Sequence, residues 1–112
     1  MKLIEAIIRP EKLGIVKDAL SEPGYPGMTV TLVKGHGNQK DISEVWRGTK
    51  YRVDLLSKIK IEITVKDSDV EKIVNAIINE SQTGSIGDGK IFILNVENIY
   101  RIRIKESGES AI

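Results

Sequence analysis

The pattern of apolar and polar positions predicts strands and helices from the first residues onward. Residues 3–8 are nearly all apolar, as expected for a central strand buried on both faces. Pro10 suits the first turn of a helix, and the apolar residues after it recur at i, i+3 and i+7 on one helix face. These residues are Leu13, Val16 and Leu20. Residues 28–33 alternate and are rich in β-branched side chains, which predicts a second strand that reaches Gly35.

Residues 37–55 differ from the rest of the chain, because polar side chains predominate and the few apolar ones follow no core-forming period. An irregular connection of this length is uncommon inside a small domain and is usually functional. Trp46, the only tryptophan, is better placed here to anchor a partner than to build a core. We therefore expect an irregular binding loop, and the alternative is a long β-hairpin with a flexible tip.

Residues 58–65 alternate cleanly, which predicts a strand with one apolar face. Ser68 and Glu71 have the spacing of a capping box at the start of a helix. The apolar residues that follow have the most regular helical period in the chain, at Val70, Ile73, Val74, Ile77 and Ile78. Residues 91–96 then form a predicted strand.

The remaining residues predict a short extra strand and a tail. Residues 99–104 alternate and place Arg101 and Arg103 on one strand face. Residues 105–110 are polar and contain glycine, so we expect a tail that stays mobile until something orders it.

The predicted fold is α+β, with the ferredoxin-like order βαββαβ and an antiparallel sheet that carries two helices on one face. The other face of this sheet would be uncovered and partly apolar. In a chain of 112 residues, such a face suggests oligomerisation through the sheet.

A glycine-rich stretch lies between the second helix and the strand after it. Residues 83–90 hold three glycines within six positions and end at Lys90, and glycine N–H groups beside a lysine suit a phosphate. The letters match most of a P-loop, but Ile91 stands where a magnesium-binding hydroxyl belongs, and the helix precedes the loop. We interpret the stretch as a phosphate-binding loop of another fold; the alternative is a plain glycine-rich turn.

Basic residues are candidates for an anion site with this loop. We expect the loop to lead into a strand beside residues 58–65, which would bring them together within a chain or across a subunit boundary. Two arginines on one strand face can bind phosphate in a bidentate way, whereas the alternative for each basic residue is a solvent-exposed charge. The four candidates are Lys58, Lys90, Arg101 and Arg103.

Composition narrows the function further. The chain is long enough for one domain, and its 17 basic and 16 acidic residues argue against a broad nucleic-acid surface. The absence of cysteine and the single histidine exclude thiolate and His-cluster metal sites. No apolar run could cross a bilayer and Glu5 interrupts any signal peptide, so we expect a cytoplasmic protein. No nucleophile–base pair stands out: His36 lies in a Gly-His-Gly turn and is interpreted as a loop residue rather than a general base, and neither Glu62 nor Asp88 has an evident acid–base partner in the sequence.

The whole chain resembles the PII signal-transduction family, the trimeric nitrogen-status sensors of bacteria, archaea and plastids. The most specific features are residues 83–92 and the pattern Arg47-Gly48-x-x-Tyr51. Further matches lie at 27–30, 33–35, 37, 39–40, 53–54, 58, 60–62, 82 and 101–103. The resemblance implies a homotrimer and a single PII domain over residues 1–112, with a T-loop at 37–55, a B-loop at 82–90 and a C-loop at 102–112.

The resemblance also implies ligands: ATP or ADP in clefts between subunits, with Mg²⁺ and 2-oxoglutarate beside ATP. The implied nucleotide-binding positions are Ile7, Thr29, Gly35, Gly37, Asn38, Thr64, Gly87, Asp88, Gly89 and Lys90, with Arg101 and Arg103 from the neighbouring subunit. The implied 2-oxoglutarate positions are Gln39, Lys40 and Lys58, and Gln39 also matches the metal ligand. Asn38 stands where many members have a phosphate-contacting arginine, which removes one charge contact.

As implied by the resemblance, the protein regulates targets and is no enzyme. Trp46, Arg47 and Tyr51 of the T-loop would contact the target. Arg47 matches the arginine that enters the cytoplasmic mouth of an ammonium transporter, and Tyr51 matches the residue modified in many bacterial members. The expected partners are such a transporter, which would recruit the protein to the membrane, and nitrogen-metabolism enzymes or regulators, but no nucleic acid.

Two other functions are compatible with parts of this sequence. An enzyme of nucleotide or phosphate chemistry could use the same fold, but it would need a nucleophile–base pair. An RNA-binding module would need exposed aromatic residues on central strands, where only Phe92 and Tyr100 are available.

Overall fold

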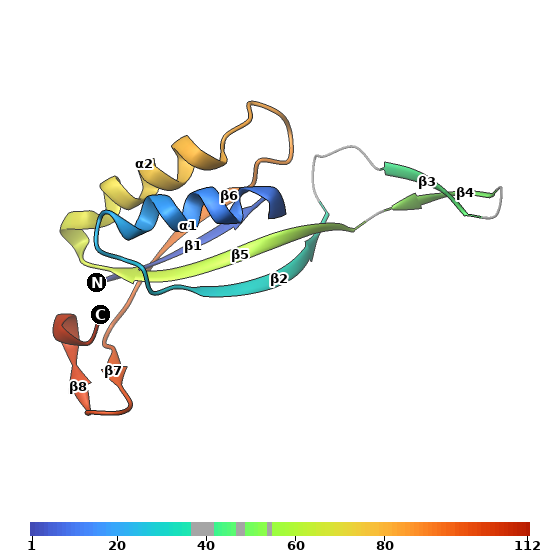
Figure 1. The fold of residues 1–112 in the computed structure, drawn as a ribbon. Helices are drawn as coiled ribbons and strands as arrows, with labels where there is room; N and C mark the ends of the chain where they lie inside the picture. Colours follow the sequence, from blue (N-terminus) through green and yellow to red (C-terminus); the bar gives the residue numbers. More distant parts are fainter. Residues whose placement is uncertain (37–41, 47–48, 54) are drawn as a thin grey trace.

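A four-stranded antiparallel sheet forms the body of the molecule, and two helices cover one of its faces (Figure 1). The computed structural model describes residues 1–36, 42–46, 49–53 and 55–112, the two middle ranges by their backbone alone. The body consists of β1 (Lys2–Ile8), α1 (Leu13–Ser21), β2 (Thr29–Gly35), β5 (Leu56–Val65), α2 (Val70–Ser81) and β6 (Lys90–Asn95). This order confirms the predicted α+β, ferredoxin-like fold.

The core lies between the sheet and the two helices. The apolar face of β5 is buried there as predicted, with Ile59, Ile61, Ile63 and Val65. The other strands and helices contribute Ile4, Ala6, Ile8, Val16, Leu20, Ile73 and Ile77. The prediction that the first strand is buried on both faces is wrong, because β1 alternates: Glu5 and Ile7 lie half-buried on the face without helices.

The strand order is β2-β5-β1-β6, so the strand that follows the glycine-rich loop pairs with β1. The expectation that it lies beside β5 is wrong. Ile7 of β1 pairs with Lys60 of β5 on one side and with Lys90 of β6 on the other. All three side chains therefore share the uncovered face, because residues directly opposite each other in a sheet point the same way.

A second, two-stranded sheet extends past the end of the body (Figure 1). Its strands are β3 (Ile42–Trp46) and β4 (Thr49–Val53). They pair antiparallel, with Ile42 opposite Val53 at one end and Trp46 opposite Thr49 at the other. For these residues the expected irregular loop is wrong and the hairpin alternative is correct. Residues such as Ile42, Val45 and Val53 favour strands, and hydrogen bonds between two strands satisfy the backbone without a core.

The entry into α2 also differs from the prediction. A short 3₁₀ turn, η2 (Asp67–Asp69), precedes the helix, and a similar turn, η1 (Pro10–Lys12), precedes α1. Asp69 rather than Ser68 occupies the N-cap position of α2, and no described side chain caps it by a hydrogen bond. The predicted capping box is therefore wrong, since the 3₁₀ turn absorbs the residues that would have formed it.

The predicted strand at 99–104 is shorter in the structure. It stops at β7 (Tyr100–Arg101), and residues 102–105 form a turn in which Lys105 has a positive φ of 56°. β7 pairs with β8 (Glu106–Ser107). Arg101 and Arg103 therefore do not share one strand face.

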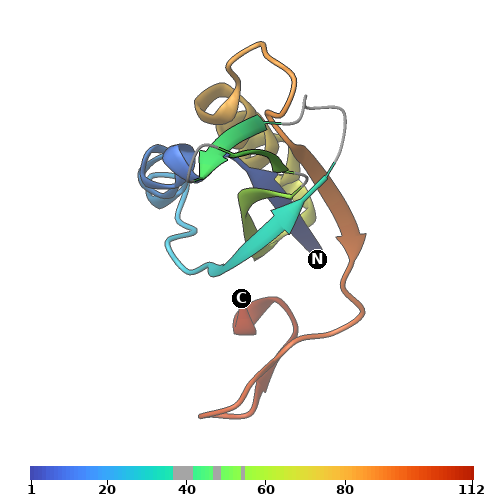
Figure 2. The ribbon, with the colours of Figure 1, turned by 90° about the vertical axis from the view of Figure 1, so that its right-hand side faces the viewer.

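The end of the chain is folded, so the expectation of a free tail is wrong. A 3₁₀ turn, η3 (Gly108–Ala111), follows β8, and the Gly108 N–H donates to the carbonyl oxygen of Ile99 at 3.1 Å. Ala111 is buried and Ile112 packs against the core, so apolar contacts order this segment. Figures 1 and 2 show it below the sheet, near the start of β1.

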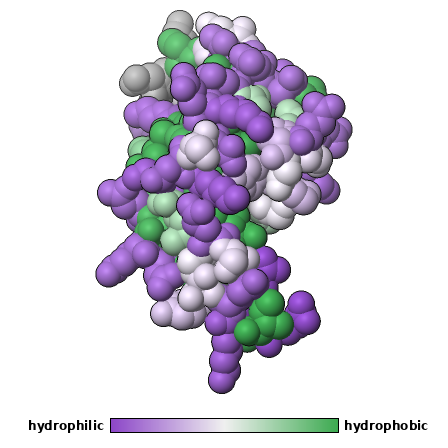
Figure 3. Space-filling model, turned by 90° about the vertical axis from the view of Figure 1, so that its left-hand side faces the viewer, coloured by the Kyte–Doolittle hydropathy of each residue, from purple (hydrophilic) through white to green (hydrophobic). Residues whose placement is uncertain are grey.

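The surface carries both hydrophilic and hydrophobic residues. On the side shown in Figure 3, hydrophilic residues predominate and apolar residues form small separate patches. No helix among the described residues is long and apolar enough to span a membrane.

Candidate functional site

The carboxylate of Asp88 closes the glycine-rich loop between α2 and β6. Its Oδ2 accepts hydrogen bonds from the backbone N–H groups of Thr83, at 2.8 Å, and Gly84, at 2.9 Å. Its Oδ1 accepts from the Thr83 hydroxyl and from Nε of Arg9, the latter at 3.0 Å. These hydrogen bonds, led by that of the Thr83 hydroxyl, hold the pKa of Asp88 well below its usual range. The Asp88 carboxylate is thus bonded within the protein, which limits its predicted role at a nucleotide to its backbone N–H.

Arg9 is a residue that the sequence reasoning missed. It directly follows β1, and besides Asp88 it binds the carbonyl oxygen of Ile86 through Nη2 at 2.9 Å. One guanidinium therefore ties two loop residues to the end of a central strand. The only sequence signal is a basic residue just after a strand, which is too common to select it.

Backbone geometry favours glycine at three positions of the loop, of which Gly84 has a φ of 87°. Gly87 and Gly89 have φ values of 103° and 104°, which L side chains rarely adopt. A Cβ built on Gly89 would lie 1.7 Å from the carbonyl oxygen of Ile7. The loop thus packs directly on the β1 backbone at Gly89.

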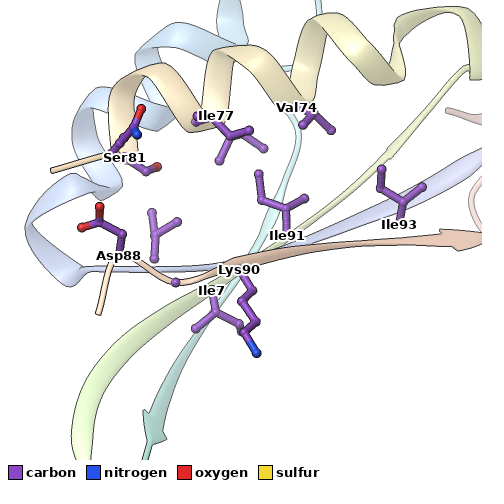
Figure 4. A pocket seen from close by; sticks show the side chains of 12 residues that line it. Ile7, Val74, Ile77, Ser81, Asp88, Lys90, Ile91 and Ile93 are labelled. Carbon is purple, nitrogen blue, oxygen red and sulfur yellow. The ribbon is translucent and has the colours of Figure 1, made fainter. Parts of the chain in front are cut away.

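A hollow of about 550 Å³ opens beside this loop, over the end of β1. Figure 4 shows the side chains of Ile7 and Lys90 on the opposite side of the sheet from α2, so the hollow lies on the uncovered face. The predicted residues that line it, here called the loop half-site, are Ile7, Gly35, Lys58, Gly87, Gly89 and Lys90. His36, Leu56, Ile86 and Phe92 complete its lining.

Lys58 is held at the edge of the loop half-site. Its Nζ donates to the carbonyl oxygen of Gly87 at 2.7 Å. Burial lowers the pKa of Lys58, and the nearby charge of Arg9 lowers it further. A cationic side chain that is partly desolvated and faces two glycines suits an anionic ligand.

Three other predicted residues line a separate hollow of about 580 Å³. Thr29, Thr64 and Arg101, here called the threonine half-site, meet there with Glu62, Tyr25 and Ile112. Arg101 Nη2 donates to Ile112 O at 3.1 Å, and its Nε lies 3.5 Å from Glu106 Oε2. Arg103 lies in the exposed turn at 102–105.

The two half-sites lie at opposite ends of the sheet. Leu3 lines one hollow and Ile7 the other, and four residues of strand span roughly 13 Å. Within one chain, the predicted cluster of four basic residues is therefore split: Lys58 and Lys90 meet, whereas Arg101 lies at the other end. Thr29 and Thr64 likewise lie with Arg101 and not with Ile7.

A third hollow, of about 430 Å³, lies between α2 and β6 (Figure 4). Its walls are mostly apolar, with Val74, Ile77, Ile91 and Ile93. The buried hydroxyl of Ser81 has no hydrogen-bond partner among the described residues. Lys90 points away from this hollow, so it is less suited to an anion than the loop half-site.

Several predicted residues cannot be placed. Gly37, Asn38, Gln39, Lys40 and Arg47 lie outside the described residues. The remaining two, Trp46 and Tyr51, belong to β3 and β4, whose side chains are likewise outside the description.

Known proteins match the chain over its length. The family model for nitrogen regulatory protein P-II matches residues 1–106. The chain is 57% identical over 112 residues to nitrogen regulatory protein P-II 2 of Methanothermobacter thermautotrophicus, covering 100% of this chain and 97% of that protein. It is 54% identical to nitrogen regulatory protein P-II of Rhizobium meliloti and to P-II 1 of Escherichia coli K12, over the full length of each.

These matches confirm the resemblance on which the site was predicted, and the relatives are named as nitrogen regulatory proteins. A nucleotide-processing enzyme on the same fold is no longer a supported alternative. The chain belongs to the nitrogen regulatory protein P-II family, and it is a regulatory protein rather than an enzyme.

Proposed function

We propose that the chain senses nitrogen, energy and carbon status by binding ATP or ADP, and 2-oxoglutarate together with Mg²⁺ and ATP, in clefts between the subunits of a homotrimer. The T-loop, residues 37–55, then changes its contacts with target proteins. The observation that carries this proposal is the loop half-site, where glycine N–H groups and two lysines surround one hollow in a P-II family member.

The loop half-site suits the phosphates of a nucleotide. Lys58 and Lys90 supply two positive charges, and Gly87 and Gly89 lie between them with positive φ. Successive backbone N–H groups in such a loop form a concave anion site. The hollow of about 550 Å³ also lies within the size range typical of small-molecule sites.

The threonine half-site would supply the remaining contacts from a second copy. Because one chain carries the two half-sites at opposite ends, one copy can complete the other only by a head-to-tail contact. Such contacts form a closed ring when the rotation between copies closes. The exposure of Phe92 and Leu94, each 46%, on the uncovered face supports an assembly that buries part of this face.

Magnesium and 2-oxoglutarate would bind in the same hollow. Among the described residues, no group of three or more His, Asp or Glu could hold a metal ion. A magnesium ion would be held by the nucleotide phosphates, Gln39 and the oxo-acid, as the family resemblance implies. Lys58 and Lys40 would then bind a carboxylate of 2-oxoglutarate.

The proposed targets are an ammonium transporter and enzymes or regulators of nitrogen metabolism. The hairpin of β3 and β4 extends beyond the body and can reach into a partner. Arg47, Trp46 and Tyr51 would make the contacts, and Tyr51 would be the position of any covalent modification. The protein would act in the cytoplasm and reach the membrane through the transporter. We propose no nucleic-acid partner, because basic and acidic residues are nearly equal in number.

Isothermal titration with ATP and ADP, with and without Mg²⁺ and 2-oxoglutarate, tests this function. We expect both nucleotides to bind, and 2-oxoglutarate to bind only with Mg²⁺ and ATP. Gln39→Ala should abolish the 2-oxoglutarate response and leave ADP binding largely intact. Equal loss of both would contradict the metal role of Gln39, and absence of any nucleotide binding would contradict the function.

Trp46 fluorescence tests the link to the T-loop. The nucleotide and oxo-acid are expected to shift the T-loop between conformations, with about 1.4 kcal/mol of differential binding for each tenfold change in population. Adding 2-oxoglutarate to the protein with ATP and Mg²⁺ should therefore change the Trp46 emission. An unchanged spectrum would argue against the loop as the responsive element.

A further inference from the structure

We propose that Arg9 is a positioning residue for the B-loop: it holds Asp88 and the Ile86 carbonyl so that the Gly87 N–H points to the anion. This inference rests on the proposed function, because it concerns the same loop half-site. It adds a residue that touches the loop rather than the ligand.

The contacts show a clamp built on the rigid end of β1. Arg9 Nε donates to Asp88 Oδ1 at 3.0 Å, and Nη2 donates to the Ile86 carbonyl oxygen at 2.9 Å. The side chains of Arg9 and Asp88 are only 16% and 23% exposed. Asp88 connects this clamp to the start of the loop, because its carboxylate also accepts hydrogen bonds from the N–H groups of Thr83 and Gly84.

The direction of the Gly87 N–H follows from the bond to Ile86. The carbonyl of Ile86 and the N–H of Gly87 belong to one planar trans peptide and point in opposite directions. When Arg9 holds that carbonyl oxygen, it fixes the peptide plane and aims the N–H away from the guanidinium. Lys58 does the same for the next peptide, because it holds the carbonyl oxygen of Gly87 at 2.7 Å.

Such a constraint matters most where the chain is free to rotate. Gly87 and Gly89 flank Asp88 with positive φ, and as glycines they have no Cβ to restrict their backbone. Without the clamp, binding an anion would first have to order this segment at a cost in conformational entropy. Arg9 is also absent from the described residues that line the hollow, which favours an indirect role.

A lysine cannot replace this arginine. Lys at position 9 would keep the charge but lose the fork of donors that binds Asp88 and Ile86 together. We therefore expect Arg9→Lys and Asp88→Asn each to weaken ATP binding roughly tenfold, the usual effect of losing a charge-assisted hydrogen bond. The loss should be largest for ATP, smaller for ADP and smallest for AMP, because the loop faces the phosphates.

The experiment is a double-mutant cycle measured by isothermal titration with ATP, ADP and AMP. It uses the full chain with Arg9→Lys, Asp88→Asn and both together, and Asp18→Asn on exposed α1 as the matched control. The loss of ATP affinity in the double variant should be less than the sum of the two single losses, because both changes remove the Arg9–Asp88 bond. Amide hydrogen exchange without ligand should be faster at Gly87 in both single variants.

The outcomes separate this inference from the proposed function. Additive losses would overturn the positioning role, because Arg9 would then act on ATP binding independently of Asp88. Full ATP affinity in Arg9→Lys, or unchanged exchange at Gly87, would also overturn it while leaving the nucleotide site intact. Wild-type protein that binds no adenine nucleotide would overturn the proposed function itself and this role with it.

Discussion

At the scale of single residues, the B-loop depends on positions where only one residue type fits. Position 89 requires glycine, because its φ is positive and a Cβ there would clash with the carbonyl oxygen of Ile7. The glycines, Lys58 and Lys90 could be predicted, since a glycine-rich loop that ends in lysine is a local pattern. Arg9 could not, because its partner Asp88 lies 79 positions away and only the folded chain joins them.

Gly89→Ala should disrupt the loop. The added Cβ would lie 1.7 Å from a backbone oxygen and impose a strained φ, which typically costs about 1–3 kcal/mol before any clash. Thermal unfolding should therefore occur at a lower temperature, and titration should show loss of ATP binding.

Gly14→Ala is the control for this change. Gly14 lies in α1 with nothing within 4 Å of the added Cβ, so alanine should stabilise the helix by about 0.5–1 kcal/mol and leave ATP binding unchanged. Normal ATP affinity in Gly89→Ala would show that the loop does not hold the phosphates.

The clamp on Asp88 should make stability depend on pH. Since the pKa of Asp88 is lower in the folded protein than the unfolded value of about 3.9, its contribution is fully present above that value and is lost as pH falls toward the folded pKa. Asp88→Asn should therefore lower the unfolding temperature at pH 7, and the difference from wild type should shrink at pH 3. A difference that stays constant with pH would contradict this assignment.

At the scale of elements, periodicity predicted what lies against the core and failed where strands have no core. The alternation of apolar residues in β5 and their helical period in α2 both predict which face of the element is buried. The sequences of β3, β4 and β7 show no such period, because β3 pairs only with β4 and β7 pairs only with β8 among the described strands. The order of the end of the chain depends on Ile112 meeting the core, which no local pattern predicts.

Two neighbouring residues of α2 test the packing of this helix. Ile77 is 1% exposed in the core, whereas Ile78 is 42% exposed. Ile77→Ala should cost about 2–5 kcal/mol of unfolding free energy, since it leaves a cavity, and Ile78→Ala should cost clearly less. Urea unfolding measures both, and equal losses would contradict the burial described for α2.

At the scale of the whole molecule, the sheet order decides where the site residues go. Nine predicted residues line the two hollows, six of them in the loop half-site and three in the threonine half-site. The prediction placed β6 beside β5 and left open whether the basic residues meet within one chain or across a subunit boundary. In the structure β1 lies between those strands, and Arg101 lies at the opposite end from Lys90. Strand order could not be read from local pattern, because every strand of the sheet is compatible with several neighbours.

This separation makes the central claim testable, namely that each site combines the loop half-site of one copy with the threonine half-site of the next. Lys90→Gln damages the first half-site and Arg101→Gln damages the second. In a head-to-tail ring that contains both variants, one cleft regains two intact halves.

The most direct measurement is therefore ATP binding by a mixture of these two variants after unfolding and refolding together. Each variant alone should bind ATP weakly, and the equimolar mixture should regain tight binding in roughly a quarter of its clefts if random trimers form. A mixture that binds no better than either variant alone would contradict a site shared between copies.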